Sequence, residues 1–193
     1  MSFWATSTGE NVADNATNEF DAGGGNFELI PDNSSVLAYV DEAGWAKDDN
    51  FNEYISIKWK VQKPEAVEGR VVFQKLWVKD PEPNALKKGA EKADQKRDKA
   101  LRMLAAIDAN AGGKLARKGT EPSDDELMLA LANKPMVITV KTWEMDTKDG
   151  KKEGNWVAAV SPKTKELKLG KAAEPKKAAT GPASDDLGDS IPF

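Results

Sequence analysis

Hydrophobic and polar residues alternate along two neighbouring stretches of this chain. Alternation with a period of two is typical of a half-buried β-strand. Between residues 54 and 61 the apolar set is Ile55, Ile57, Trp59 and Val61. The polar set of the same stretch includes Tyr54, Lys58 and Lys60. Over residues 70–79 the alternation places four side chains on one face: Phe73, Lys75, Trp77 and Lys79. We expect two paired strands with a turn at 64–69, Trp59 in the core and Trp77 exposed.

The remaining hydrophobic runs predict three further strands and a helical region. Residues 36–40 indicate a first strand, followed by a loop at 44–50 that carries Trp45 and Lys47. A helix is expected over 84–109. Residues 86–118 contain ten basic and four acidic residues, which could form a phosphate-facing patch, but ordinary solvated charge is the better interpretation. A loop is expected from 111 to 122. Ser123 and Glu126 have the spacing of a capping box and predict a short helix.

Residues 136–143 and 156–160 indicate the fourth and fifth strands, joined by a loop at 146–155. Three strands, a helix and two strands is the element order of an OB fold. We therefore expect a mainly β domain over 27–162, a five-stranded Greek-key OB barrel with a helix between strands 3 and 4. OB barrels bind oligonucleotides on strands 2 and 3, between the loops that join strands 1–2 and 4–5.

Aromatic and basic residues occur at each of those places. Aromatic rings can stack on bases while lysines neutralise phosphates, which predicts binding of single-stranded DNA. Because exposed aromatics need unpaired bases, duplex DNA is a weaker prediction, although duplex DNA and RNA stay open. The candidate residues are Trp45, Lys47, Tyr54, Lys58, Lys60, Phe73, Lys75, Trp77, Lys79, Lys141, Trp143, Lys148, Lys151 and Lys152.

Composition narrows the chemistry and divides the chain. The 193 residues include no cysteine and no histidine, which removes thiol nucleophiles, histidine acid–base catalysis and the usual zinc sites. Residues 1–46 contain eight acidic and no basic residues, so the rest of the chain is net positive although the whole carries −4. We expect a flexible acidic leader over 1–26 and a disordered linker over 163–183. No apolar run is long enough to span a membrane, which predicts a cytoplasmic protein.

The last ten residues, 184–193, combine acids with an apolar end. They resemble the acidic tip of bacterial single-stranded DNA-binding proteins, through Asp185, Asp186, Asp189, Ile191, Pro192 and Phe193. The spread acids and Ser190 before Ile191 depart from that motif. The body resembles the single-stranded DNA-binding proteins of tailed bacteriophages instead, through 27–31, 69–77, Asn84 with the following helix, and 134–137.

That resemblance implies an OB fold, sequence-tolerant binding of single strands, and recruitment of replication, recombination or repair proteins through the tip, in the cytoplasm of an infected bacterium. We expect no cofactor, no metal site and no enzymatic activity. An adaptor or mediator that acts mainly through protein contacts is the alternative. A nuclease is disfavoured because Glu166 and Lys168 lie in the expected linker, far in sequence from Asp32. Oligomeric state does not follow from the sequence.

Overall fold

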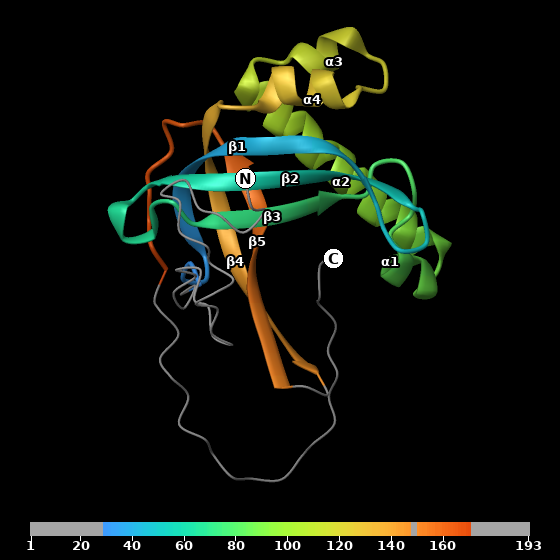
Figure 1. Cartoon of the computed structure of the whole chain (residues 1–193), viewed down its shortest axis with the longest axis horizontal. Helices are drawn as coiled ribbons and strands as arrows, with labels where there is room; N and C mark the ends of the chain where they lie inside the picture. Colours follow the sequence, from blue (N-terminus) through green and yellow to red (C-terminus); the bar gives the residue numbers. More distant parts are fainter. Residues whose placement is uncertain (1–28, 148–149, 171–193) are drawn as a thin grey trace, which may run out of the picture.

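The computed structural model describes residues 29–147 and 150–170 of the chain. Its main element is one antiparallel sheet of five strands in the spatial order β3-β2-β1-β4-β5 (Figure 1). The prediction of a mainly β protein is therefore confirmed. The strands are β1 (Ser34–Lys47), β2 (Glu53–Lys63), β3 (Val71–Leu76), β4 (Pro135–Thr147) and β5 (Gly150–Ser161).

Strand β1 connects two parts of the sheet. Residues 34–39 pair with β4, and residues 37–47 pair with β2. The register against β2 shifts between Val40 and Glu42, an irregularity typical of a strand that bends. Strands β3 and β5 are the two edge strands of the sheet. They contact each other, but within the described residues no ladder of hydrogen bonds joins them. The sheet is therefore open between β3 and β5.

The apolar side of the predicted alternation on β2 forms part of the core. Ile55, Ile57 and Trp59 have no exposed surface. The indole N–H of Trp59 donates a hydrogen bond to the side-chain oxygen of Gln74 on β3, at 2.9 Å. Because this buried donor has a partner, the large ring can lie in the core without an unsatisfied polar group. The prediction that Trp59 is a core residue is confirmed.

Within the described residues, the helices lie between β3 and β4 in the chain. The continuous helix expected over 84–109 is wrong, because Gly89 has a φ of 117°, outside the helical region, and interrupts it. The loop expected over 111–122 contains a short helix. The predicted capping box is confirmed, since the Ser123 side chain accepts from the Glu126 N–H while the Glu126 side chain accepts from the Ser123 N–H. No helix of 29–147 or 150–170 is long and apolar enough to cross a membrane. The helices are α1 (Pro83–Lys87), α2 (Ala90–Ala111), α3 (Lys114–Lys118) and α4 (Asp124–Leu131), and a 3₁₀ turn, η1 (Glu65–Val67), follows β2.

The strands are longer than the hydrophobic pattern predicts. Strand β1 runs through most of the loop expected at 44–50, and β4 and β5 occupy most of the loop expected at 146–155. The expected linker also starts too early, because the backbones of Ser35 and Lys168 exchange two hydrogen bonds. The acidic leader, the remaining linker and the terminal tip lie outside the described residues.

Candidate nucleic-acid interface

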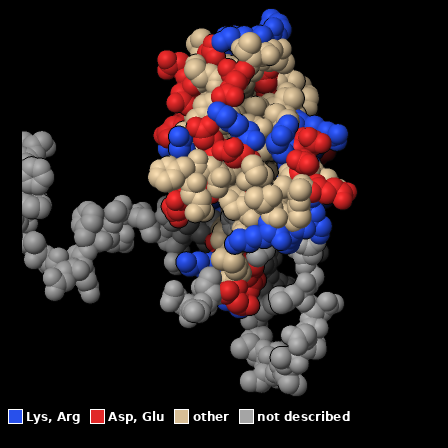
Figure 2. Space-filling model, turned by 90° about the vertical axis from the view of Figure 1, so that its right-hand side faces the viewer, with Lys and Arg blue, Asp and Glu red and all other residues tan. Residues whose placement is uncertain are grey.

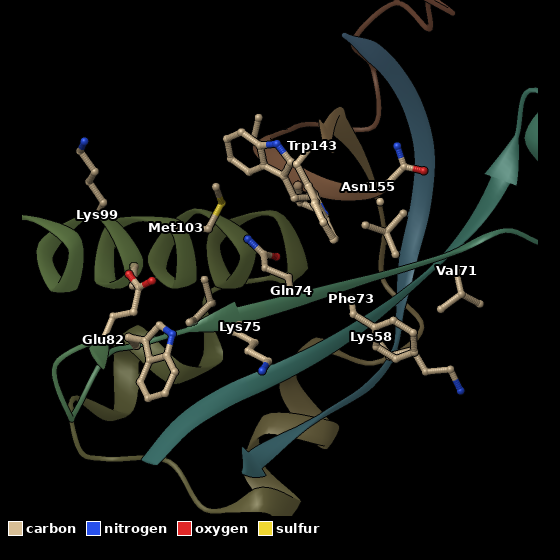
Figure 3. Close-up of a pocket in the computed structure, with 18 of the residues that line it drawn as sticks. Lys58, Val71, Phe73, Gln74, Lys75, Glu82, Lys99, Met103, Trp143 and Asn155 are labelled. Atoms are coloured by element: carbon tan, nitrogen blue, oxygen red, sulfur yellow. The ribbon is translucent and has the colours of Figure 1, made fainter. Parts of the chain in front are cut away.

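A groove of about 970 Å³ occupies the opening between β3 and β5. Helix α2 forms its third wall, so elements that are far apart in the sequence surround one space (Figure 3). Apolar side chains and the stems of basic side chains supply most of the lining. The residues used below are Lys58, Arg70, Phe73, Lys75, Trp77, Glu82, Lys96, Lys99, Met103, Trp143, Gly154 and Trp156.

Strand β3 provides one aromatic wall of the groove. Its side chains alternate between exposed and buried positions, and Phe73 is 65% exposed. Lys75, the next residue on the exposed face, holds its ammonium nitrogen 5.0 Å from the centre of the Tyr54 ring, a cation–π distance. Phe73 therefore presents a largely exposed ring on the same face of β3 as Lys75.

The β4–β5 hairpin provides the opposite wall, and its shape depends on a glycine. Trp143 on β4 pairs with Gly154 on β5. A Cβ atom built on Gly154 would lie only 2.7 Å from three atoms of the Trp143 ring. The indole therefore lies directly over the backbone of Gly154, in space that the side chain of any larger residue would occupy. Figure 3 shows Trp143 and Met103 of α2 on the same side of the groove.

Trp156 of β5 is a groove residue that sequence reasoning missed. It pairs with Lys141, two positions from Trp143 on β4, so both tryptophans lie on the same face of the hairpin. The shared face of Trp143 and Trp156 follows only from the pairing register of β4 and β5. The sequence pattern did not give that register, because it assigned residues 146–155 to a loop. Both rings line the groove and neither is fully buried.

Helix α2 provides basic and apolar side chains that were also missed. Lys96, Lys99 and Met103 follow the spacing i, i+3, i+7 and lie on one helical stripe. Lys96 pairs with the carboxylate of Glu82 at 2.7 Å, and Glu82 is only 3% exposed. Glu82 is the one acidic residue among the described residues that line the groove. The lining contains five cations: Lys58, Arg70, Lys75, Lys96 and Lys99.

At the mouth of the groove, Lys58 is held by acidic neighbours on β1. Its ammonium nitrogen lies 2.8 Å from Glu42 and 3.0 Å from Asp41. These hydrogen bonds, with Glu42 the larger contributor, raise the pKa of Lys58 above its ordinary value. The lysine is charged at neutral pH, but an anionic ligand competes with two carboxylates for it.

A second group of predicted lysines forms ion pairs away from the groove. Lys79 lies 2.7 Å from Glu53 and 3.2 Å from Glu121, and Lys47 lies 3.3 Å from the same Glu53. Hydrogen bonds from Lys79 and then Lys47 lower the pKa of Glu53. At the end of the molecule shown in Figure 2, acidic and basic side chains are interspersed. The charges of Lys47 and Lys79 are thus already paired with carboxylates. This pairing does not support their expected role in DNA binding.

The prediction that Trp77 is exposed is wrong. Strand β3 ends at Leu76, and the Val78 N–H donates to the Leu76 carbonyl at 3.1 Å, which turns the backbone and ends the alternation. Trp77 is 7% exposed and packs on Tyr54 with ring centres 4.8 Å apart. Tyr54, at 9% exposed, is correspondingly covered, so neither ring has a free face for a base.

Trp45 also differs from the prediction, because it lies in β1 rather than in a loop. Its indole N–H donates to the Pro122 carbonyl at 2.8 Å, and its backbone N–H donates to Asp124 at 2.6 Å. The ring packs against the core, and Lys79 covers it at 5.6 Å. Trp45 therefore fixes the start of α4 to the sheet.

The other predicted residues lie outside the groove. Lys60 is exposed on β2, Lys141 is half-buried on β4, and Lys151 and Lys152 are exposed on β5 rather than in a loop. Lys151 pairs with Glu144 across the hairpin, which raises the pKa of the lysine. Lys148 and the terminal tip lie outside the described residues.

No protein-family model matches this chain, and a search of curated proteins finds no similar sequence. The resemblance to phage single-stranded DNA-binding proteins thus stays a prediction.

Proposed function

We propose that this protein binds single-stranded DNA in the groove between β3 and β5, with little dependence on base sequence. The observation that carries the proposal is the lining, where the partly exposed rings of Phe73, Trp143 and Trp156 stand among five cations and a single acid. Each ring can stack on a base of any identity, an interaction of about 1–3 kcal/mol per base. The cations neutralise the phosphates that connect those bases.

The strand arrangement supports the same proposal. In an OB barrel the first strand pairs with both the second and the fourth, as β1 does here. We propose that the sheet is an OB fold opened between β3 and β5, with α2 beside the opening. The DNA-binding surface then extends from the solvent-facing side of β2 and β3 into the groove. One DNA strand can contact both parts of this surface.

An unpaired strand suits this groove better than a duplex. Stacking requires open base faces, which a double helix hides between its base pairs. The rings come from opposite walls of a partly open groove, so a ligand must be narrow enough to enter between β3 and β5. Cations that neutralise phosphates release counterions from the DNA, so binding should weaken as salt rises. Asp41 and Glu42 must release Lys58 before a phosphate can bind it.

The proposed cellular role rests on the sequence of the tip. Its acids and its apolar end would bind a partner with an apolar pocket and a basic rim, as expected for recruitment of replication, recombination or repair proteins. We propose that the groove protects single strands while the tip recruits such proteins in an infected bacterial cell.

Titration of the full chain with oligo-dT and with a duplex, followed by tryptophan fluorescence at two salt concentrations, tests the proposal. We expect quenching by oligo-dT that salt weakens, and little response to the duplex. Lys99→Gln should weaken binding and reduce the salt slope by about one unit. The matched control is Arg97→Gln, which removes one positive charge from an exposed residue of α2 that does not line the groove, about 160° around the helix from Lys99.

Two results would contradict the proposal. Equal effects of the Lys99 and Arg97 substitutions would mean that the groove is not the site. Absence of quenching together with capture of a protein partner by the tip would favour the adaptor alternative.

A further inference from the structure

Phe51 occupies the tip of the turn between β1 and β2, outside the groove. It is 80% exposed, more than any other large apolar side chain in the described residues. A ring in this position contributes almost no apolar burial to the fold, so its presence has no explanation in packing.

The backbone at Phe51 is also in an unfavourable conformation. Its φ is +64°, in the left-handed region that glycine and asparagine adopt more readily than bulky residues. Strain at an exposed residue with no packing role points to a function for the side chain.

A set of hydrogen bonds holds the turn in this shape. The Asp48 carboxylate accepts from the backbone N–H groups of Asn50 and Asn52, at 2.9 and 2.8 Å, and from the Asn52 side chain at 3.0 Å. The Phe51 N–H donates to the Asp48 carbonyl at 3.0 Å. Because the polar groups around it are satisfied within the turn, the ring of Phe51 is presented on a fixed support.

The turn lies next to the basic end of the groove. Lys75, which lines the groove, holds its ammonium nitrogen 5.0 Å from the centre of the Tyr54 ring, and Tyr54 follows Phe51 by three residues at the start of β2. At the base of the turn, the Glu53 N–H donates to Asp80, and Glu53 also pairs with Lys79. A single strand of DNA that leaves the groove past Lys75 therefore reaches the turn that carries Phe51.

We propose that Phe51 is a base-stacking residue that extends the DNA track beyond the groove. This inference rests on the proposed function of the groove. The neighbours of Phe51 in the turn are polar, so the ring stands alone rather than within an apolar patch. A single isolated ring suits one base, which stacks on one face, better than a protein partner, which needs a contiguous buried area.

Three variants of the full chain test the inference. Phe51→Asn removes the ring and suits the positive φ, so folding is preserved and the melting temperature stays equal or rises. Phe51→Tyr keeps a ring and should bind like the wild type. Leu129→Ala is the control, because Leu129 is 73% exposed but lies on α4 away from the track.

Binding is measured with oligo-dT of about 4 and about 16 nucleotides, which span the site sizes of a single OB fold. We expect Phe51→Asn to weaken binding of the long oligonucleotide between about 5-fold and 150-fold, the value of one base stack. Binding of the short oligonucleotide, which the groove alone accommodates, should stay unchanged.

The outcomes separate the two proposals. If the wild type binds neither oligonucleotide, the proposed function fails. If Lys99→Gln weakens binding but Phe51→Asn binds the long oligonucleotide like the wild type, the inference about Phe51 alone is wrong. An equal loss for both lengths would also overturn it, since Phe51 would then not lie beyond the groove.

Discussion

Replacing Gly154 with alanine places a methyl group beneath the Trp143 ring. The new Cβ would lie 2.7 Å from ring atoms, whereas carbon atoms in contact lie about 3.5–4.0 Å apart. The indole must therefore move away by about 1 Å. Because Trp143 is only half-buried, it can move without displacing the core.

Two opposing terms set the effect of Gly154→Ala on stability. Overpacking costs about 1–3 kcal/mol in a closed core, and the lower end applies to a ring that can shift. Gly154 does not have a positive φ, so alanine also restricts the unfolded chain and contributes about 0.4–1 kcal/mol of stability. We expect the free energy of unfolding to change by less than about 1 kcal/mol, while DNA affinity falls by up to the value of one stack, about 1–3 kcal/mol.

The assay is a double-mutant cycle with Trp143→Ala. Affinity for oligo-dT is measured for the wild type, both single variants and the double variant, and urea unfolding is measured in parallel. If Gly154→Ala acts through the ring, it has no further effect once Trp143 is absent. An equal loss of affinity in both backgrounds would refute this reasoning.

Three further predictions follow from other contacts. Asp41→Asn removes one of the carboxylates that hold Lys58, so oligo-dT should bind up to about 5-fold more tightly at low salt; this gain should disappear when Lys58→Gln is added, and its persistence would contradict the competition. Ser123→Ala removes the cap of α4 and should lower the free energy of urea unfolding by about 0.5–2 kcal/mol, with DNA affinity unchanged; an affinity loss would connect α4 to the site. Removing residues 184–193 should tighten oligo-dT binding at low salt if the anionic tip competes with DNA for the lysines; unchanged affinity would exclude that competition.

The sequence predicted the strands well where their alternation continued. Trp59 was correctly placed because residues 55–61 keep one period within a single strand. Trp77 was not, because it follows the last residue of β3, where a backbone turn replaces the alternation. A two-residue period gives the face of a side chain only while the strand lasts.

The groove could be predicted only in part. Phe73, Lys75 and Trp143 were candidates from the pattern, and all three line it. Lys99 and Trp156 were not, because their places depend on how α2 and the β4–β5 hairpin pack around the opening. Charge counts could not show that Lys58 and Lys79 have carboxylate partners either, since those partners come from other strands and loops.

The double pairing of β1 has a consequence for the order of folding. Only a short turn separates β1 from β2 in the chain. Pairing of β1 with β4 instead closes a long loop that contains β2, β3 and helices α1 to α4. Closing a longer loop costs more conformational entropy and slows folding. We therefore expect β1–β2–β3 to form early and the β4–β5 hairpin to dock late. Since the groove needs both, a refolding chain should bury Trp59 before it gains the ability to bind a ligand.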